Sequence, residues 1–373
     1  MIDRVSLVGE YYVHDGYAGM SEYIAVGMAR LGVQVNPVPL KLTREGLSAD
    51  FLDILSRSRA PGGEPLIFNS WIRPALEPYA QREHFIHTMW ESSRVPASWL
   101  PWLNRAKALM VPTRFVADMF RASGVTPPVE VTPDGVDPDV YHYVERPERE
   151  GITTLVVGTV VPRKHVGHAI RAWQSAFDGD PAARLIIKAR FGAMGRGGLT
   201  VDDDRITVVD GDETTRGILH WYERADVLLA LGSEGFGLPL VEGMATGLPA
   251  IALSSEGQGD VCADAGDLVL AVPPAGWEDV VEPELGRCGV RGVPDIDQVV
   301  RHLEWVKKHR SEARDLGRAA SEWQRVGQTR SHARRPPPSF FWMKSYACIV
   351  MPPVLIGQSH GTCCTASHWT QQQ

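Results

Sequence analysis

Short apolar runs alternate with amphipathic segments along most of this chain. In the first half, the apolar runs predict strands at 5–8, 33–38, 66–68, 85–87, 108–111 and 129–131, and the amphipathic segments predict helices at 19–31, 47–56, 97–104 and 114–122. The second half predicts strands at 153–157, 185–188, 206–209, 227–230 and 250–253, and helices at 166–177, 215–222 and 239–246. Apolar runs set between helices are typical of strands buried on both faces. The pattern therefore predicts an α/β protein with two parallel-sheet domains.

A polar stretch at 144–151 (VERPEREG) interrupts this alternation and contains Pro147. Charged residues around a proline are typical of an interdomain linker. We therefore expect a first Rossmann-like domain at 1–147 and a second at 148–322. Ligands of open parallel sheets bind beyond the carboxyl ends of the strands, so two such domains facing each other would enclose a substrate in their cleft.

The composition changes near the end of the chain. All 45 acidic residues lie at or before Glu322, whereas 323–373 holds three of the five cysteines, a triple proline and a terminal triple glutamine. We interpret 323–373 as an atypical tail. One hypothesis is that the reading frame changed near Trp323. The alternative is a disordered extension, against which the apolar residues of the tail argue.

Composition narrows the class of protein. A chain of 373 residues with 44% hydrophobic content is long enough for two globular domains, and its net charge of −7 argues against a nucleic-acid-binding protein. The five cysteines include no Cys-x-x-Cys pair, which favours a reducing compartment without structural zinc. The N-terminus lacks the features of a signal peptide, and the apolar stretch 340–357 is interrupted by Lys344 and two prolines. We therefore expect a cytoplasmic protein without a transmembrane segment.

The stretch 231–249 (LGSEGFGLPLVEGMATGLP) is the richest in candidate chemistry. It follows a predicted strand, its glycines let a ligand approach the main chain, and Pro239 suits the first turn of a helix. The start of a helix presents unpaired N–H groups and a positive dipole end, which favour phosphate. Glu234 and Glu242 add carboxylates for hydroxyl groups, although either one alone is explained as well by the helix dipole. Together these features predict a site for a phosphorylated sugar.

A second candidate lies at 153–164 (TTLVVGTVVPRK), where a predicted strand ends at Gly158. Arg163 and Lys164 follow in the next loop. Two cations at a strand end suit a diphosphate, because charge-assisted hydrogen bonds would neutralise it as a leaving group. The alternative is that Arg163 and Lys164 are solvent-exposed loop residues without a ligand, which is the usual state of isolated cations.

The segment from Glu234 to Glu242, EGFGLPLVE, resembles the signature of the family 4 retaining glycosyltransferases, the glycosyl transferases group 1. The resemblance covers roughly 5–323. It implies the GT-B fold, in which two Rossmann-like parallel-sheet domains face each other across a cleft. The segment 153–164 is similar to the family's phosphate-binding segment: Lys164 matches its lysine, Thr159 stands where its first arginine is usual, and Arg163 is the candidate to compensate.

The resemblance also points to segments of the first domain. In HDGYAGMSE (14–22), Gly19 matches a loop that approaches the donor phosphate, with Met20 in place of the usual second glycine. In FIHTMWESS (85–93), His87 matches a histidine that faces the donor sugar, although a lone histidine at a strand end is more often structural. The residues expected on the acceptor side are Trp90, Glu91, Ser92 and Arg94.

The resemblance implies an enzyme that transfers a hexose from a nucleoside diphosphate sugar to an acceptor hydroxyl, with retention at the anomeric carbon and no protein nucleophile. The implied site residues are Glu234 for the donor-sugar hydroxyls, Glu242 for the ribose, Arg163 and Lys164 for the diphosphate, and Gly235, Phe236, Gly237 and Leu238 for sugar and phosphate contacts. Arg190 either borders the base or belongs to a plain loop. We expect no metal and no cofactor, since the nucleotide sugar is a substrate. The acceptor is an unidentified carbohydrate, lipid or protein.

Alternative functions are kept open. Two alternatives with the same GT-B fold are a nucleotide-sugar epimerase and a phosphorylase. A further reading is a catalytically inactive protein that binds nucleotide sugars, since the resemblance fades at Trp323, where the family's C-terminal helix should continue toward the first domain. An NAD-dependent oxidoreductase is disfavoured, because no G-x-G-x-x-G follows the first predicted strand.

Overall fold

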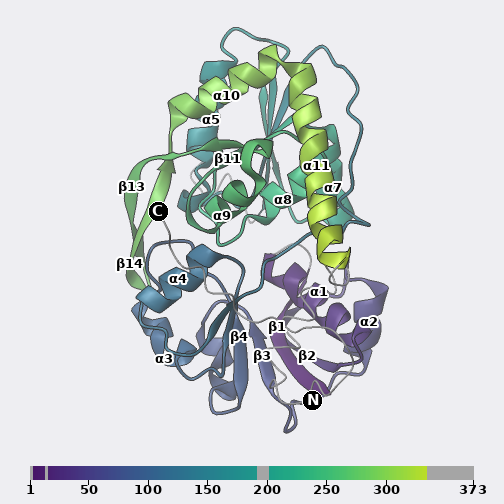
Figure 1. Ribbon diagram of the computed structural model, residues 1–373, viewed down its shortest axis with the longest axis vertical. Helices are drawn as coiled ribbons and strands as arrows, with labels where there is room; N and C mark the ends of the chain where they lie inside the picture. Colours follow the sequence, from purple (N-terminus) through teal and green to yellow (C-terminus); the bar gives the residue numbers. More distant parts are fainter. Residues whose placement is uncertain (1–2, 13–15, 191–200, 334–373) are drawn as a thin grey trace.

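The structure is a computed structural model that describes residues 3–12, 16–190 and 201–333, with side chains in the last range up to 325. Two six-stranded sheets form two units, one above the other in Figure 1. Every pairing within these two sheets is parallel. The predicted α/β fold with two parallel sheets is therefore confirmed.

The first unit contains a sheet with the strand order β2-β1-β3-β4-β5-β6. Its strands are β1 (Arg4–Tyr11), β2 (Gln34–Leu42), β3 (Leu66–Asn69), β4 (His84–His87), β5 (Leu109–Val111) and β6 (Val129–Val131). Its helices are α1 (Gly16–Arg30), α2 (Ala49–Ser56), η1 (Pro74–Tyr79), η2 (Ala97–Trp99), α3 (Leu100–Leu103) and α4 (Arg114–Ala122). Two separate apolar clusters form its core, as expected for a sheet with helices on both faces.

The second unit contains a sheet with the order β12-β11-β10-β7-β8-β9, which is the order of doubly wound dinucleotide-binding folds. Its strands are β7 (Thr153–Val157), β8 (Arg184–Ala189), β9 (Ile206–Asp210), β10 (Val227–Ala230), β11 (Ala250–Leu253) and β12 (Leu270–Val272). Its helices are η3 (Pro162–Lys164), α5 (Val166–Ala176), α7 (Thr215–Arg224), α8 (Leu238–Ala245), α9 (Glu256–Ala265), η4 (Gly266–Leu268), α10 (Ile296–Lys308) and α11 (Arg310–Ala333).

Each sheet has a point where the direction of the strand order reverses. In the first sheet this switch point lies between β1 and β3, and in the second it lies between β7 and β10. Connections leave the sheet on opposite faces at such a point, so a crevice forms at the carboxyl ends of the two strands. The fold therefore places one crevice in each unit.

An antiparallel hairpin, β13 (Pro274–Glu282) and β14 (Gly286–Pro294), extends from the second unit onto the first (Figure 1). The backbone N–H of Ser93 donates to the carbonyl of Val290 at 2.9 Å, and the Ser92 hydroxyl donates to the carbonyl of Cys288. Leu285, in the turn, packs against the core of the first unit. No element had been predicted for this stretch.

Helices α4 and α9 form a second contact between the units. The backbone N–H of Phe115 donates to Oδ2 of Asp260 at 2.9 Å, and Arg114 pairs with Asp264 at 2.9 Å. The hydroxyl of Thr113, which also caps α4, donates to the carbonyl of Gly235 at 3.0 Å. The carboxyl ends of the two sheets are therefore held facing each other.

The segment between the sheets packs on the second unit. Val136 and Tyr141 belong to its core, before the predicted boundary after residue 147. The buried Arg146 donates from Nε to the carbonyl of Ala225 at 3.0 Å. The predicted linker is thus anchored to the second unit.

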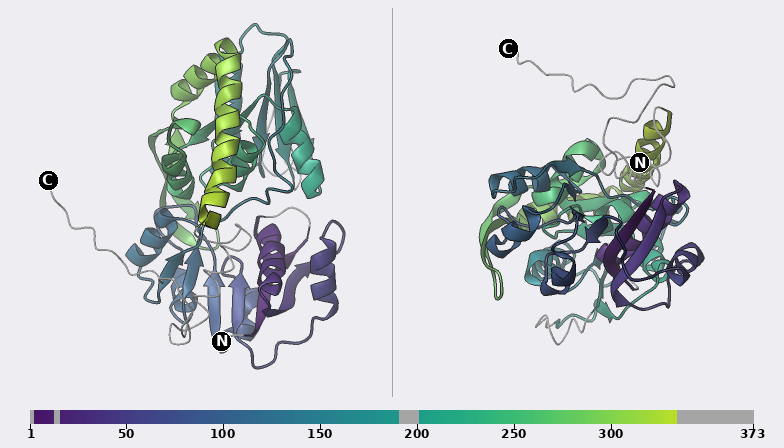
Figure 2. Two further views of the ribbon diagram at one scale, coloured as in Figure 1. Left: turned by 45° about the vertical axis from the view of Figure 1, so that its right-hand side comes forward. Right: turned by 90° about the horizontal axis from the view of Figure 1, so that it is seen from below.

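Helix α11 continues through Trp323 to Ala333 and runs along the second unit toward the first (Figure 2). The rest of the predicted tail, 334–373, lies outside the described residues. Within the described ranges, no helix combines the length and the apolar character that crossing a bilayer requires.

Candidate active site

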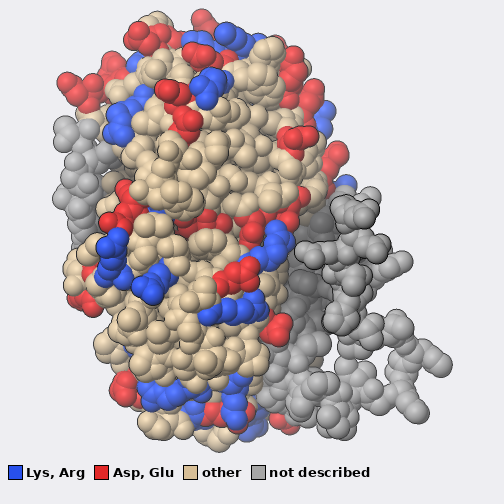
Figure 3. Space-filling model, turned by 60° about the vertical axis from the view of Figure 1, so that its left-hand side comes forward, with Lys and Arg blue, Asp and Glu red and all other residues tan. Residues whose placement is uncertain are grey.

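A cavity of about 830 Å³ lies between the two units, at the carboxyl ends of both sheets. Residues that follow β1, β3 and β4 line it from the first unit, and residues that follow β7, β8 and β10 line it from the second. The predicted site residues in its lining are Gly19, Arg163, Lys164, Arg190, Glu234, Phe236, Gly237, Leu238 and Glu242. Figure 3 shows acidic and basic side chains along the boundary between the units. The crevices at both switch points thus open into one space.

Glu234 is the centre of an ion cluster in this cavity. Its Oε2 accepts a hydrogen bond from Nη1 of Arg163 at 2.8 Å, and its Oε1 pairs with Nζ of Lys164. Arg163 and Lys164 follow β7, and Glu234 follows the adjacent strand β10, so the switch point brings them together across a long sequence separation. The side chain of Glu234 is 12% exposed, which means that its charge is held mostly away from water.

The cluster extends to the first unit through Glu91. Its Oε1 lies 3.7 Å from Nη2 of Arg163. Burial raises the pKa of Glu91. Burial also acts against ionisation of Glu234, but Lys164 and Arg163 outweigh it and lower the pKa of Glu234. At neutral pH, Glu234 is therefore ionised and neutralises cations that a diphosphate would otherwise meet.

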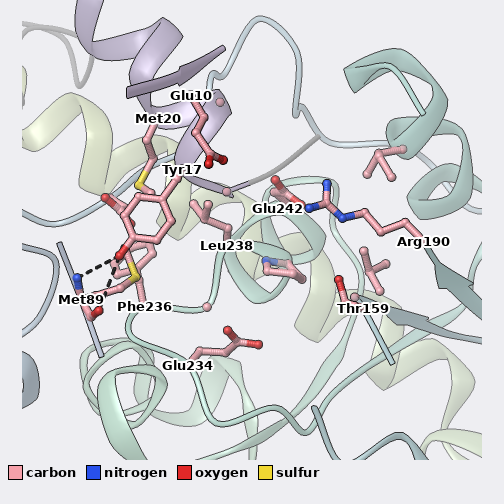
Figure 4. A pocket seen from close by; sticks show the side chains of 18 of the residues that line it. Glu10, Tyr17, Met20, Met89, Thr159, Arg190, Glu234, Phe236, Leu238 and Glu242 are labelled. Atoms are coloured by element: carbon pink, nitrogen blue, oxygen red, sulfur yellow. Dashed lines mark hydrogen bonds between the residues drawn. The ribbon is translucent and has the colours of Figure 1, made fainter. Parts of the chain in front are cut away.

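Glu242 is oriented by a buried tyrosine. The hydroxyl of Tyr222 donates to Oε2 of Glu242 at 2.7 Å, and the ring of Tyr222 packs edge-on against Tyr141 with 6.2 Å between centroids. Burial raises the pKa of Glu242. Figure 4 shows Arg190, which follows β8, pointing toward Glu242. The predicted ribose and base residues thus lie at one end of the cavity.

The start of α8 faces the cavity as predicted. Gly237 precedes the helix with φ of 99°, a left-handed conformation that favours glycine. A Cβ on Gly237 would also come within 2.8 Å of Oε1 of Gln258. Leu238 and Pro239 form the first turn, so the unpaired N–H groups of α8 point toward a bound anion.

Gly235, in the same loop, contacts the first unit. The cavity lining formed by the described residues includes Phe236 and Gly237 but not Gly235. A Cβ on Gly235 would meet the Met89 side chain at 2.7 Å, and its carbonyl accepts the Thr113 hydrogen bond. Glycine is needed here because the first unit approaches the loop closely, so Gly235 serves the contact between units.

His87 also lies outside the lining that the described residues form, beneath the cavity floor, with 0% exposure. Its Nδ1 lies 2.7 Å from Oδ1 of Asn69. The Asn69 amide group donates to Ser21 and to the carbonyl of Tyr17, so its oxygen accepts and Nδ1 of His87 carries the proton. Nε2 lies 3.8 Å from Asp134, and burial lowers the pKa of His87 to about 3. A neutral, buried histidine supports the floor, and its contact with the donor sugar stays a prediction.

On α1, Gly19 lines the cavity, and no described atom lies within 4 Å of the place where its Cβ would stand. The sequence did not single out Tyr17, two residues earlier. Its hydroxyl accepts from the backbone N–H of Met89 at 3.1 Å (Figure 4). Thr159 lines the second unit's side, where the family resemblance led us to expect an arginine.

The predicted acceptor-side residues separate into two groups. Trp90 and Glu91 line the cavity. Ser92 is buried, and its hydroxyl donates to the carbonyl of Cys288 on the hairpin. The backbone of Arg94 lies close to Gly289 of the hairpin, where an added Cβ would come within 2.9 Å of the Arg94 nitrogen. The missed lining residues include a group near the ends of β1, β2 and β3: Glu10, Tyr12, Lys41, Trp71 and Arg73. Their position near the ends of neighbouring strands is the feature of the sequence that could have indicated them.

The comparisons with known proteins agree with this geometry. Residues 204–323 match the family described as Glycosyl transferases group 1. This range contains the Glu234 loop, α8 and Glu242. The match lies within the second unit. Among curated proteins, no sequence matches the chain.

Several solved structures have a similar fold. Sucrose-phosphate synthase from Thermosynechococcus elongatus is 16% identical with a TM-score of 0.63, over 87% of this chain and 94% of that one. WaaG, a glycosyltransferase involved in lipopolysaccharide biosynthesis, is 14% identical with a TM-score of 0.59, over 93% and 99%. The α,α-trehalose 6-phosphate synthase from Burkholderia multivorans is 11% identical with a TM-score of 0.58, over 94% and 98%. These likenesses show the GT-B fold, and with the matched domain they support a glycosyltransferase.

Proposed function

We propose that the protein is a family 4 retaining glycosyltransferase that moves a hexose from a nucleoside diphosphate sugar to an acceptor hydroxyl. The observation that carries this proposal is the arrangement of Glu234, Arg163 and Lys164 beside the start of α8, with Glu242 in the same cavity. These groups match the three parts of such a donor. A cytoplasmic location fits the free thiols of Cys262 and Cys288.

The diphosphate is bound by Arg163, Lys164 and the N–H groups at the start of α8. As the bond between sugar and phosphate breaks, negative charge grows on the leaving phosphate, and fixed cations stabilise it without having to reorganise. In this proposal, the two side chains supply the charge that a metal ion would supply, so no metal or cofactor is required.

Glu234 binds hydroxyls of the donor sugar. An ionised carboxylate offers roughly four lone-pair positions, so it still accepts hydroxyl hydrogens while Arg163 and Lys164 occupy one side. The same two cations make Glu234 a poor nucleophile and a poor base, because they stabilise its negative charge. This supports a mechanism in which the leaving phosphate, and not a protein carboxylate, accepts the proton of the acceptor.

The test is a thermal-stability screen of UDP-, GDP- and ADP-hexoses with the full chain. A donor at 100 times its dissociation constant stabilises the fold by about 2.7 kcal/mol. Glu242→Ala should then weaken nucleotide binding by at least about tenfold in calorimetry, because a positioned contact to the ribose is lost. The matched control is Glu304→Ala, an exposed glutamate on α10.

The outcomes separate the alternatives. Unchanged nucleotide affinity in Glu242→Ala would contradict the ribose assignment. Appearance of an epimer from the donor alone would indicate an epimerase, and a requirement for inorganic phosphate would indicate a phosphorylase. Donor binding without turnover against a broad acceptor panel would indicate an inactive nucleotide-sugar-binding protein.

A further inference from the structure

A cluster of polar and aromatic side chains occupies the first unit's switch point, opposite the donor residues. It consists of Glu10, Tyr12, Lys41, Trp71 and Arg73, and all five line the cavity. We call it the rim cluster. It comes from the carboxyl ends of β1, β2 and β3, where open parallel sheets bind ligands. Figure 4 shows Glu10 pointing into the same pocket as Glu234 and Glu242.

Trp71 presents a large aromatic surface to the cavity. Its side chain is 45% exposed, although it follows a strand whose last residues are fully buried. The backbone beneath it is fixed: Asn69 is held by Ser21 and Tyr17, and the N–H of Ser70 donates to the carbonyl of His87 at 3.3 Å. A ring on a fixed backbone has fewer orientations to lose when a ligand packs on it.

The polar members of the rim cluster, which line the same cavity, hold each other in place. Arg73 pairs with Oε1 of Glu10, and the hydroxyl of Tyr12 donates to Oε2 of Glu10 at 3.0 Å. Glu10 is 8% exposed. Nζ of Lys41 lies 4.0 Å from the centroid of the Tyr12 ring. The result is a preorganised row of charged and hydroxyl groups in the same cavity as an open aromatic face.

This combination fits a sugar ring. One face of a pyranose carries C–H groups that pack on an aromatic ring, while its hydroxyls require donors and acceptors at the edge. A lipid chain would fit poorly, because it would desolvate Glu10, Arg73 and Lys41 without giving them hydrogen bonds. The cavity volume of about 830 Å³ lies in the upper part of the range for a single drug-sized ligand, which leaves space beside the donor.

We propose that the rim cluster is the acceptor subsite and that it binds a hexopyranoside, whose ring packs on Trp71 and whose hydroxyls bond to Glu10 and Arg73. The assignment of this sugar as the acceptor rests on the proposed function. Its binding at the rim cluster does not, since it depends on residues of the first unit alone.

The test measures binding separately from turnover. Methyl glycosides of glucose, galactose, mannose and N-acetylglucosamine are titrated into the full chain by calorimetry and by saturation-transfer NMR, with and without UDP or GDP. We expect at least one glycoside to bind. Trp71→Ala should weaken it by at least about tenfold, whereas Trp71→Phe should stay within about threefold because the aromatic face remains.

Trp277→Ala is the matched control, because Trp277 is 60% exposed on β13 and lies outside the lining that the described residues form. It should leave glycoside binding unchanged, and all three variants should keep the wild-type affinity for UDP or GDP. If Trp71→Ala does not fold by circular dichroism, Glu10→Gln takes its place, with the same expected loss.

The inference is overturned if no glycoside of the panel binds, or if Trp71→Ala binds it as tightly as the wild type. Failure of the proposed function looks different. If glycoside binding depends on Trp71 but no sugar is transferred from any donor, the rim cluster binds sugars and the transferase proposal fails. If transfer occurs to an acceptor without a sugar ring and is unchanged in Trp71→Ala, the transferase proposal stands and this inference fails.

Discussion

Glu234 has two roles that act against each other in donor binding. It neutralises Arg163 and Lys164 in the free protein, and it is the proposed partner of the donor-sugar hydroxyls. The first role opposes binding of the diphosphate, and the second favours binding of the sugar. A substitution that removes the charge but keeps the shape separates the two roles.

We predict that Glu234→Gln binds the free nucleoside diphosphate about tenfold more tightly and transfers sugar at least about 100-fold more slowly. The first effect arises because the cations no longer have a competing carboxylate. The second arises because a contact that strengthens in the transition state is weakened. Calorimetry with UDP or GDP and steady-state kinetics measure the two effects.

Glu304→Gln is the control for the charge change, because Glu304 is exposed on α10. Weaker diphosphate binding in Glu234→Gln would show that the carboxylate does not compete with the diphosphate. Full transfer activity would remove Glu234 from the site.

His87 makes stability depend on pH. Burial lowers its pKa from 6.5 to about 3 in the folded protein. The unfolded chain therefore binds a proton as the pH falls through about 6.5, while the folded protein binds it near 3. Stability that is fully present above 6.5 is lost toward 3, at up to about 1.4 kcal/mol per pH unit.

Replacing this side chain should remove that dependence. Between pH 7 and pH 5, we expect the free energy of unfolding of His87→Gln in urea to fall by about 2 kcal/mol less than that of the wild type. His220→Gln, which replaces an exposed histidine on α7, should behave as the wild type does. Parallel pH profiles for His87→Gln and the wild type would contradict the buried, neutral state of His87.

At the scale of elements, the hairpin of β13 and β14 is one of the contacts that tie the second unit to the first. Its tip residue Leu285 packs against the first unit's core and also lines the cavity. On the same hairpin, Val281 is 66% exposed. The two positions offer a matched pair for the same substitution.

We predict that Leu285→Asp lowers the transfer rate at least about tenfold, while nucleotide affinity stays within about threefold. A charge at Leu285 would be desolvated against an apolar core, so the hairpin detaches, but the donor residues of the second unit are untouched. Small-angle scattering should show a larger radius of gyration. Val281→Asp should change neither quantity, and equal activity of the two variants would rule out a closing role for the hairpin tip.

The sequence located every strand of the first sheet and every strand of the second except β12 (Leu270–Val272), because these strands are short apolar runs between helices. It gave no prediction for the hairpin, whose β13 alternates exposed and partly buried residues such as Trp277 and Asp279. It also missed α9, which begins at Glu256 with a positive φ and contains Gly257 and Gly259, all weak signals for a helix. Both elements pack closely against other parts of the chain: Gly257 of α9 lies against the carbonyl of Gly235, and Gly292 of β14 lies against Ser255. Such tertiary contacts are not visible in the local sequence pattern.

At the scale of the whole molecule, the site could be predicted only in parts, because its assembly also depends on tertiary contacts. The Glu234 loop and the two cations could be predicted as separate phosphate and sugar elements, because each follows an apolar run. Their mutual ion pairing could not, since it depends on which strands are neighbours at the switch point. The placement of Gly235 against Met89 likewise depends on how the two units meet.

The hydrogen bond from Thr113 to Gly235 joins the first unit to the loop that holds Glu234. Any hinge motion that separates the units must break this bond, and if the loop moves with it, opening and donor affinity are thermodynamically linked. The linkage is reciprocal: if a bound acceptor favours the closed arrangement and thereby tightens the donor by some factor, the donor tightens the acceptor by the same factor.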